Sequence, residues 1–273
     1  MKSMRWQWFR SVLTGNMRLA LAYPLGFWAS LLAELIIVGS MNWYLWHAVV
    51  DARGGVAFEG YSTWTLVLYT MITSTLRKVQ VNSGMFAGIG EDIYSGALNK
   101  YLVYPVSYFG FRFAMQLGSA IMSLIQCSLA LGLFWFVAAS DAQPLPSVTA
   151  LVQFFILVFV SVGLRFVINT AIQTTAFWFE QIWALLVLFS FLIALLGGQL
   201  VPLDLYPVWA QEILKYTPFP MLAALPAEAL LGKLTWASFS FGLCVGLIWS
   251  VVGLGIAQFI FNRGVRNYSG IGA

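Results

Sequence analysis

Charged side chains are scarce in this chain of 273 residues. Its 14 Lys and Arg and 10 Asp and Glu residues amount to 9% of the sequence, against about 25% in typical soluble domains. Apolar and aromatic residues make up 60% of it, and the mean hydropathy is +0.84. A water-soluble domain of this size cannot hide that much apolar surface. The composition excludes a soluble enzyme, a disordered regulator and a nucleic-acid-binding module, and it predicts a protein whose solvent is lipid.

Residue types that carry out catalysis or hold metals are also few. The one histidine, His47, lies among tryptophans, and the two cysteines, Cys127 and Cys244, lie inside apolar runs. This supply offers neither a disulfide framework nor a set of metal ligands. The run Gly232-Lys233-Leu234-Thr235 lacks the Ser or Thr that directly follows the lysine of a phosphate loop. We therefore expect no catalytic residue, no metal and no cofactor on this chain.

Six stretches are expected to span a membrane. An α-helix needs about 20 apolar residues to cross a hydrocarbon core of about 30 Å. The second stretch is the weakest and is rich in Thr and Ser, so we expect it to borrow from its flanks or to be partly buried against its neighbours. The prediction is an all-α polytopic membrane protein with a single transmembrane domain over residues 1–273. The predicted spans are residues 25–49, 61–80, 113–139, 148–168, 182–201 and 236–261.

The basic residues set the expected orientation. Cytoplasmic flanks of membrane spans are enriched in Lys and Arg. Eleven of the 14 basic residues fall on the side that carries both termini and the loop between the second and third spans. We therefore expect both termini in the cytoplasm. The basic residues expected outside are Arg53, Lys215 and Lys233, and the acidic residues with them are Asp51, Glu59, Asp141, Asp204, Glu212 and Glu228.

Residues 1–23 precede the first span and combine basic with aromatic side chains. Trp8 and Val12 are spaced as on one face of a helix, a pattern typical of an amphipathic helix that lies in the membrane interface. Asn16 and Arg18 interrupt the apolar run, which argues against a cleavable signal peptide. A frayed basic tail is the alternative interpretation.

The cytoplasmic loop over residues 81–112 is too long for a simple turn. Acidic residues at the start and a lysine near the end of Glu91–Leu102 suit the dipole of a short helix. A helix that transmits motion from a cytoplasmic partner and an amphipathic packing loop are both open interpretations. The expected apolar face consists of Tyr94, Leu98 and Tyr101, and the residues toward its rim are Glu91, Asp92 and Lys100.

Residues 202–235 are expected outside and are rich in proline. They contain two apolar segments, Val208–Tyr216 and Met221–Leu231, which are too short to span a bilayer. We expect a re-entrant pair of short helices in the outer leaflet. Irregular backbone at that depth must be buried in protein or line a cavity, so the pair is interpreted as an external cap.

Glu34 is the acidic residue that lies deepest in a predicted span, about 14 Å along the first one by helical rise. A carboxylate at that depth is costly to expose to lipid, so it should face protein or water. A polar point on a transport route and a hydrogen bond to a neighbouring helix are both open interpretations.

Two of these segments resemble the permeases of ABC-2-type transporters. The run from Gly90 to Ser107, which contains Ile93, Gly96 and Pro105, resembles the cytoplasmic segment after their second span. The run Pro202-Leu203-Asp204-Leu205-Tyr206-Pro207, with the prolines that follow it, resembles their extracellular segment before the last span. The nearest branch holds the permeases grouped with viologen and drug exporters.

The resemblance implies the membrane subunit of an ATP-driven exporter in the bacterial cytoplasmic (inner) membrane. Its partners would be a second permease, as a homodimer or heterodimer, and two ATP-binding subunits that hold ATP and Mg²⁺. The implied coupling residues are Glu91, Asp92, Tyr94, Leu98, Asn99, Lys100 and Tyr101. The residues carried over to the translocation path are Glu34, Met41, Thr70, Thr73 and Phe189, and those of the external gate are Pro202, Asp204, Pro207, Pro218, Phe219 and Pro220.

Two other classes compete with this interpretation. A secondary transporter would favour several membrane-embedded carboxylates and an internal repeat, whereas this chain has one such carboxylate and no clear repeat. A non-transport membrane scaffold stands beside it, and a lipid-modifying polytopic enzyme would need clustered polar residues near one interface. Glu91 and Asp92 come closest to such a cluster.

Overall fold

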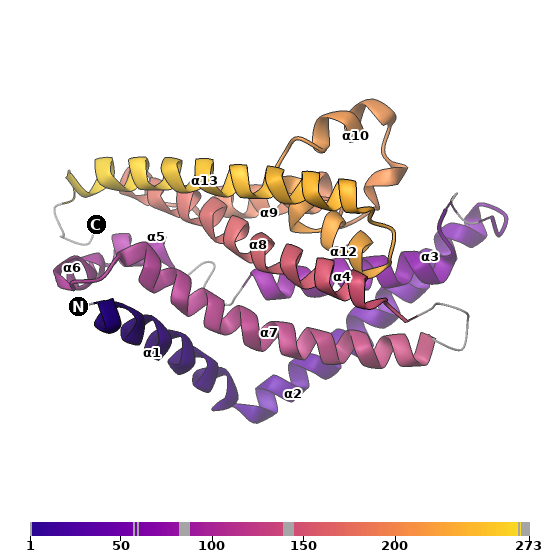
Figure 1. The fold of residues 1–273 in the computed structure, drawn as a ribbon, viewed down its shortest axis with the longest axis horizontal. Coiled ribbons are helices and arrows are strands. Elements are labelled where there is room, and N and C mark those ends of the chain that lie inside the picture. The colour runs from indigo at the N-terminus through magenta and orange to yellow at the C-terminus, as the bar shows by residue number, and fades with distance from the viewer. Residues whose placement is uncertain are drawn as a thin grey trace.

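The computed structural model describes residues 2–56, 58, 60–81, 88–138, 145–266 and 268, apart from the side chains of residues 2–6, 20 and 24. Every regular element in these ranges is a helix, so the predicted all-α class is confirmed. The long helices run along the long axis of the molecule (Figure 1). Residues 82–87 of the cytoplasmic loop, Glu59 and Asp141 lie outside the described residues.

Four helices in the described ranges are long and apolar enough to cross a membrane. They correspond to the first, third, fourth and sixth predicted spans. The first comprises α2, a π-helical segment η1 and α3, and the fourth predicted span continues from α8 into a short 3₁₀ helix, η3. The bounds are α2 Pro24–Ala33, η1 Glu34–Val38, α3 Gly39–Ala52, α7 Tyr108–Ala138, α8 Val148–Gln173, η3 Thr174–Phe177 and α13 Trp236–Arg266.

The second predicted span is the helix α4, Thr63–Gln80, which lies in the middle of the protein. Its N-terminus is capped by Ser62, whose Oγ accepts a hydrogen bond from the backbone N–H of Thr65 at 3.1 Å. Of its 18 residues, 13 are buried. Thr70 and other hydroxyls donate to backbone carbonyls of the preceding turn, so their polar groups are satisfied inside the protein. A helix surrounded by protein tolerates this composition, which is less apolar than that of the other spans.

The fifth predicted span is shorter than expected. The helix α9 covers Trp183–Leu196, which is 14 residues and about 21 Å long. It ends at Gly197 and Gly198, and Gly198 has a φ of +75°, a left-handed conformation that favours glycine. The chain then turns back, and the N–H of Ala224 donates to the carbonyl of Gly197 at 3.0 Å. The count of six spans therefore remains a proposal.

The N-terminal helix α1, Lys2–Leu21, packs along the first half of α7. The Nδ2 of Asn16 donates to Ser119 Oγ at 2.8 Å and to the carbonyl of Met115. The two backbones approach closely at Gly118, where an added Cβ would lie 2.6 Å from the carbonyl oxygen of Leu13. The expected helix is present, and its neighbour over this length is α7.

The segments predicted to form the cytoplasmic coupling region and the external cap lie toward opposite ends of the long helices (Figure 1). The helices α5 and α6 lie at the end where α1 begins and α13 ends. Near the start of α13 lie a 3₁₀ turn, η4, and the short helices α10, α11 and α12. Of these, α10 stands outermost, while α11 and α12 are largely buried. The bounds are α5 Ile89–Tyr94, α6 Leu98–Val103, η4 Leu203–Leu205, α10 Val208–Leu214, α11 Phe219–Leu222 and α12 Ala224–Leu230.

Candidate functional site

The segment Glu91–Leu102 contains two short helices where one was expected. The first, α5, ends at Tyr94, and α6 starts at Leu98. Between them Gly96 has a φ of +74°, the left-handed conformation that commonly terminates a helix. The expectation of one continuous helix was wrong because it treated this glycine as an ordinary helical position.

Asp92 anchors α5 to the start of α7. Its carboxylate pairs with the guanidinium of Arg112 and accepts a hydrogen bond from the hydroxyl of Tyr108 at 2.5 Å. Arg112 also donates to the carbonyl of Gly88 at 3.3 Å. Asp92 is only 7% exposed, so its predicted place at the rim was wrong. The sequence signal that could have revealed this pair is the presence of opposite charges on the two sides of one predicted bend.

The expected docking face of α5 and α6 is turned toward the rest of the chain. Leu98 is 0% exposed and packs in a cluster that includes Ile93 and Phe261. The ring of Tyr101 lies 5.4 Å from that of Tyr108, centroid to centroid. Leu98 was therefore placed wrongly on the partner's side. A segment beneath a bundle must first bury its own apolar side chains, and the helical period cannot distinguish the two sides.

Tyr94 is tied to the loop between η3 and α9. Its hydroxyl donates to the carbonyl of Phe179 at 2.8 Å, and burial raises its pKa. On the same helix, the N–H of Gly90 donates to Oε1 of Gln173 at 3.2 Å. A Cβ added to Gly90 would lie 2.6 Å from Cδ1 of Ile182. These contacts hold α5 close against the end of α8.

The residues on the opposite side of α5 and α6 are exposed at the surface of the chain. Val103 is 84% exposed at the C-terminal end of α6, next to exposed Leu102. Together they give this end of the molecule a small apolar surface with charged and polar residues around it. The exposed residues of the segment, here called the outer face, are Glu91, Ser95, Asn99, Lys100, Leu102, Val103 and Tyr104.

Glu34 lies against α4. Its Oε2 is 3.6 Å from Nζ of Lys78, which also donates to the carbonyl of Ser30 at 3.4 Å. Glu34 opens the π-helical segment η1, and single π turns within α-helices are frequent at functional positions. The sequence analysis did not predict the pairing of Glu34 with Lys78, which lies in the last turn of α4.

The other residues carried over to the translocation path do not converge within this chain. Thr70 and Thr73 are buried in α4, where Thr70 accepts from Nε1 of Trp46 at 3.1 Å. Thr73 donates to the carbonyl of Gln199 at 3.0 Å. Met41 is exposed on α3, while Phe189 is partly buried on α9. Their assignment to a path stays a prediction.

The residues carried over to the external gate lie where the short outer helices begin. Pro202, Pro207 and Pro218 precede η4, α10 and α11 respectively. Asp204 accepts a hydrogen bond from the hydroxyl of Tyr61 at 2.8 Å, which ties η4 to the chain just before α4. Phe219 and Pro220 open α11, and Pro220 is buried.

The next feature is the supply of side chains that could bind a metal ion. Within the described residues, no group of three or more His, Cys, Asp or Glu side chains is placed so that it could hold a metal ion. The two cysteines are free thiols, with Cys127 buried and Cys244 exposed.

The helical fold and the apolar spans define an integral membrane protein. Residues 35–272 match the family model described as ABC-2 family transporter protein. Because the match covers most of the chain, the protein belongs to this family. No curated protein matches the chain.

Proposed function

We propose that this chain is the permease subunit of an ATP-driven exporter. It works with a second permease, identical or related, and with two ATP-binding subunits that hold ATP and Mg²⁺. Membership of the ABC-2 family carries the proposal, and it implies association with ATP-binding subunits in general terms. The structured segment α5–α6 at one end of the molecule gives such a subunit a place to dock.

The contacts of α5 and α6 make them suited to transmit a push. The Asp92–Arg112 pair links α5 to α7, and the hydrogen bond from Gly90 to Gln173 links it to α8. Leu98 packs in the cluster that contains Phe261 of α13. A partner that moves the outer face as a rigid body therefore moves the ends of three long helices together, without a separate hinge between them.

The proposed path lies between two copies of the permease and includes the first span. Glu34 and its partner Lys78 are only partly buried. The charged pair at the π-helical segment is therefore accessible at the surface of this chain, where a second permease would face it. Such pairs inside the membrane are costly and are retained where polar passage needs them. Export across a bacterial cytoplasmic membrane, with both termini inside, fits the eleven basic residues that the predicted topology places on one side.

The proposal is tested by purifying the chain alone and together with an ABC ATP-binding subunit encoded beside it. The chain alone should hydrolyse no ATP, and the complex should contain two ATP-binding subunits whose hydrolysis depends on Mg²⁺. ATP hydrolysis by the chain alone, or the failure of every neighbouring ATPase to bind it, would contradict the assignment.

Orientation is tested with two lysines at opposite ends. Lys215→Cys and Lys100→Cys are each made in a Cys244→Ser background, because Cys244 is the exposed native thiol. A membrane-impermeant maleimide should label Lys215→Cys on intact cells and Lys100→Cys only after permeabilisation. The reverse pattern would invert the proposed topology.

A further inference from the structure

The segment between α9 and the start of α13 lines a cavity of about 560 Å³ that is open to the surface. All of its lining comes from residues 203–242, which comprise η4, the short outer helices and the start of α13. The size is in the range of sites for small organic molecules. Its apolar walls include Pro220, Leu225 and Phe241, and its charged residues are Asp204, Glu212, Lys215, Glu228 and Lys233.

Most of these charged groups already have partners. Glu212 pairs with Lys215 on the surface of α10. Lys233 donates to the carbonyl of Gly60 at 2.8 Å, and its Nζ lies 3.0 Å from the centroid of the Tyr61 ring. Asp204 accepts from the Tyr61 hydroxyl. Both lysines are therefore directed to partners of their own, which leaves the cavity without a free cation.

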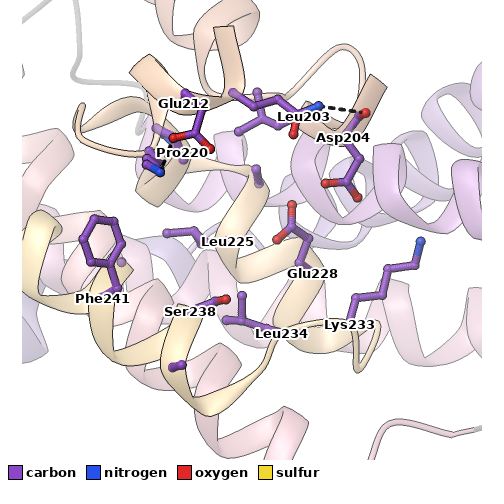
Figure 2. Close-up of a pocket in the computed structure, with 15 residues that line it drawn as sticks. Leu203, Asp204, Glu212, Pro220, Leu225, Glu228, Lys233, Leu234, Ser238 and Phe241 are labelled. Carbon is purple, nitrogen blue, oxygen red and sulfur yellow. Dashed lines mark hydrogen bonds and ion pairs between the residues drawn. The ribbon is translucent and has the colours of Figure 1, made fainter. Parts of the chain in front are cut away.

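Glu228 differs from the other charged residues that line the cavity. Its carboxyl group points from α12 into the cavity, with Phe241 to one side and Lys233 to the other (Figure 2). No hydrogen bond or ion pair joins it to the described residues. A partly buried carboxyl group without a partner in the protein is disfavoured unless something else supplies the missing charge or hydrogen bond.

We propose that this cavity binds a small organic cation, with the ammonium group on the carboxylate of Glu228 and the apolar body against Leu225 and Phe241. A carboxylate beside an aromatic ring and aliphatic walls is the chemistry that recognises ammonium groups. The site lies inside one chain, whereas the proposed path lies between two permeases. Binding to it can be measured without ATP or partner subunits, so it does not depend on the exporter assignment.

Protonation of Glu228 gives the site a characteristic pH dependence. Burial first, and then the negative charge of Asp204, raise the pKa of Glu228 to about 8, against an opposing effect of Lys233. The cation binds the deprotonated form, so binding below this pH releases a proton. Affinity should fall by about 20-fold between pH 8.5 and 6.5 for a group that titrates near pH 8. The other ionisable groups near Glu228 are Asp204, Glu212, Lys215, Lys233, Tyr61 and Tyr69.

The test uses the full 273-residue chain in nanodiscs of phosphatidylglycerol, a lipid without an ammonium group. Radiolabelled phenyltrimethylammonium is the probe, and tert-butylbenzene, which replaces the charged nitrogen with carbon, is the neutral control. We expect saturable binding of the probe below about 1 mM, as suits a ligand of this size, and no displacement by the neutral control. A second set of nanodiscs contains phosphatidylethanolamine, whose headgroup carries an ammonium group. If the site binds lipid headgroups, this lipid should displace the probe; if the site binds soluble cations, probe binding should be the same in both sets.

Two isosteric variants locate the site. Glu228→Gln should weaken probe binding at pH 8.5 by at least about tenfold, as loss of a partly buried charge partner does, and should abolish its pH dependence. Glu212→Gln, which alters a carboxylate at the rim of the same cavity, should change the affinity less than about twofold. The proposal is overturned if the probe does not bind, if tert-butylbenzene displaces it, or if the two variants behave alike.

Discussion

The two ends of the molecule treat a carboxyl group that faces the protein in opposite ways. At the end with α5 and α6, Asp92 is held by Arg112 and Tyr108. At the other end, Glu228 faces a cavity with no partner among the described residues. A paired carboxylate fixes the position of the helix that carries it, whereas an unpaired one stays available to a ligand. In the functions proposed above, the first carboxylate belongs to a part of the chain that transmits force and the second to a part that binds a ligand.

Removing the partner of a buried charge should have the largest effect. Asp92→Ala leaves the partly buried Arg112 without its counter-charge, and breaking a fully buried pair typically costs about 3–5 kcal/mol, which sets the upper bound here. We expect the variant to show a lowered Tm in detergent or to fail to accumulate. Glu91→Ala, one residue away on an exposed side chain, is the matched control and should be close to wild type.

A double variant distinguishes loss of the pair from loss of fit. Asp92→Leu combined with Arg112→Met removes both charges and keeps the bulk, so most of the lost stability should return. If the double variant is as unstable as Asp92→Ala, the ion pair is not the reason for the effect.

Packing of α6 gives the next largest effect. Leu98 is fully buried, and truncation of such a leucine costs about 2–5 kcal/mol. Leu98→Ala should therefore lower the Tm of the isolated chain, while Leu102→Ala on the exposed side should leave it nearly unchanged. Equal Tm values for the two variants would return Leu98 to the partner's side.

The contrast between Asp92 and Glu228 can be sharpened with pH. Glu228 has a folded-state pKa of about 8, above its ordinary value near 4.5. Between these values the folded state holds a proton that the unfolded state has released, so stability falls as pH rises from 4.5 to 8. The Tm of the wild type should therefore drop relative to that of Glu228→Gln across this window. Parallel curves for the two proteins would show that Glu228 titrates normally.

An exposed pair should have the smallest effect. Glu212 and Lys215 pair on the surface of α10, where solvent screens the interaction. Glu212→Ala should shift the Tm by less than about 1 °C, since exposed ion pairs contribute little. A larger shift would mean that α10 is held in place by this pair.

The sequence predicted the structure best where apolar residues dominate a long segment. Four of the predicted spans correspond to long apolar helices. The remaining two depend on tertiary surroundings that composition cannot report. The helix α4 keeps its threonines because protein surrounds it, and α9 is cut short at the left-handed Gly198.

The candidate site was harder to predict because the position of a side chain depends on the whole bundle. The spacing of Tyr94, Leu98 and Tyr101 predicted one apolar face, but the side on which it lies depends on how α7 and α13 pack. Asp92 and Arg112 are 20 residues apart; their opposite charges on the two sides of a predicted bend allow a pair, but whether the pair forms depends on how α5 packs against α7. The sequence placed Glu228 among the acidic residues expected outside the membrane. Only the structure shows that it lines a cavity.

In the proposed function, α5 and α6 dock an ATP-binding subunit through their outer face. Val103→Glu and Val208→Glu test it most directly, because both valines are highly exposed, at 84% and 74%, at the two ends of the molecule. Each variant is co-expressed with the ATP-binding subunit, and the amount that co-purifies is measured. The account predicts a loss of at least about tenfold for Val103→Glu, as for a charge placed within an apolar contact, and no loss for Val208→Glu. Equal co-purification of both variants would contradict it.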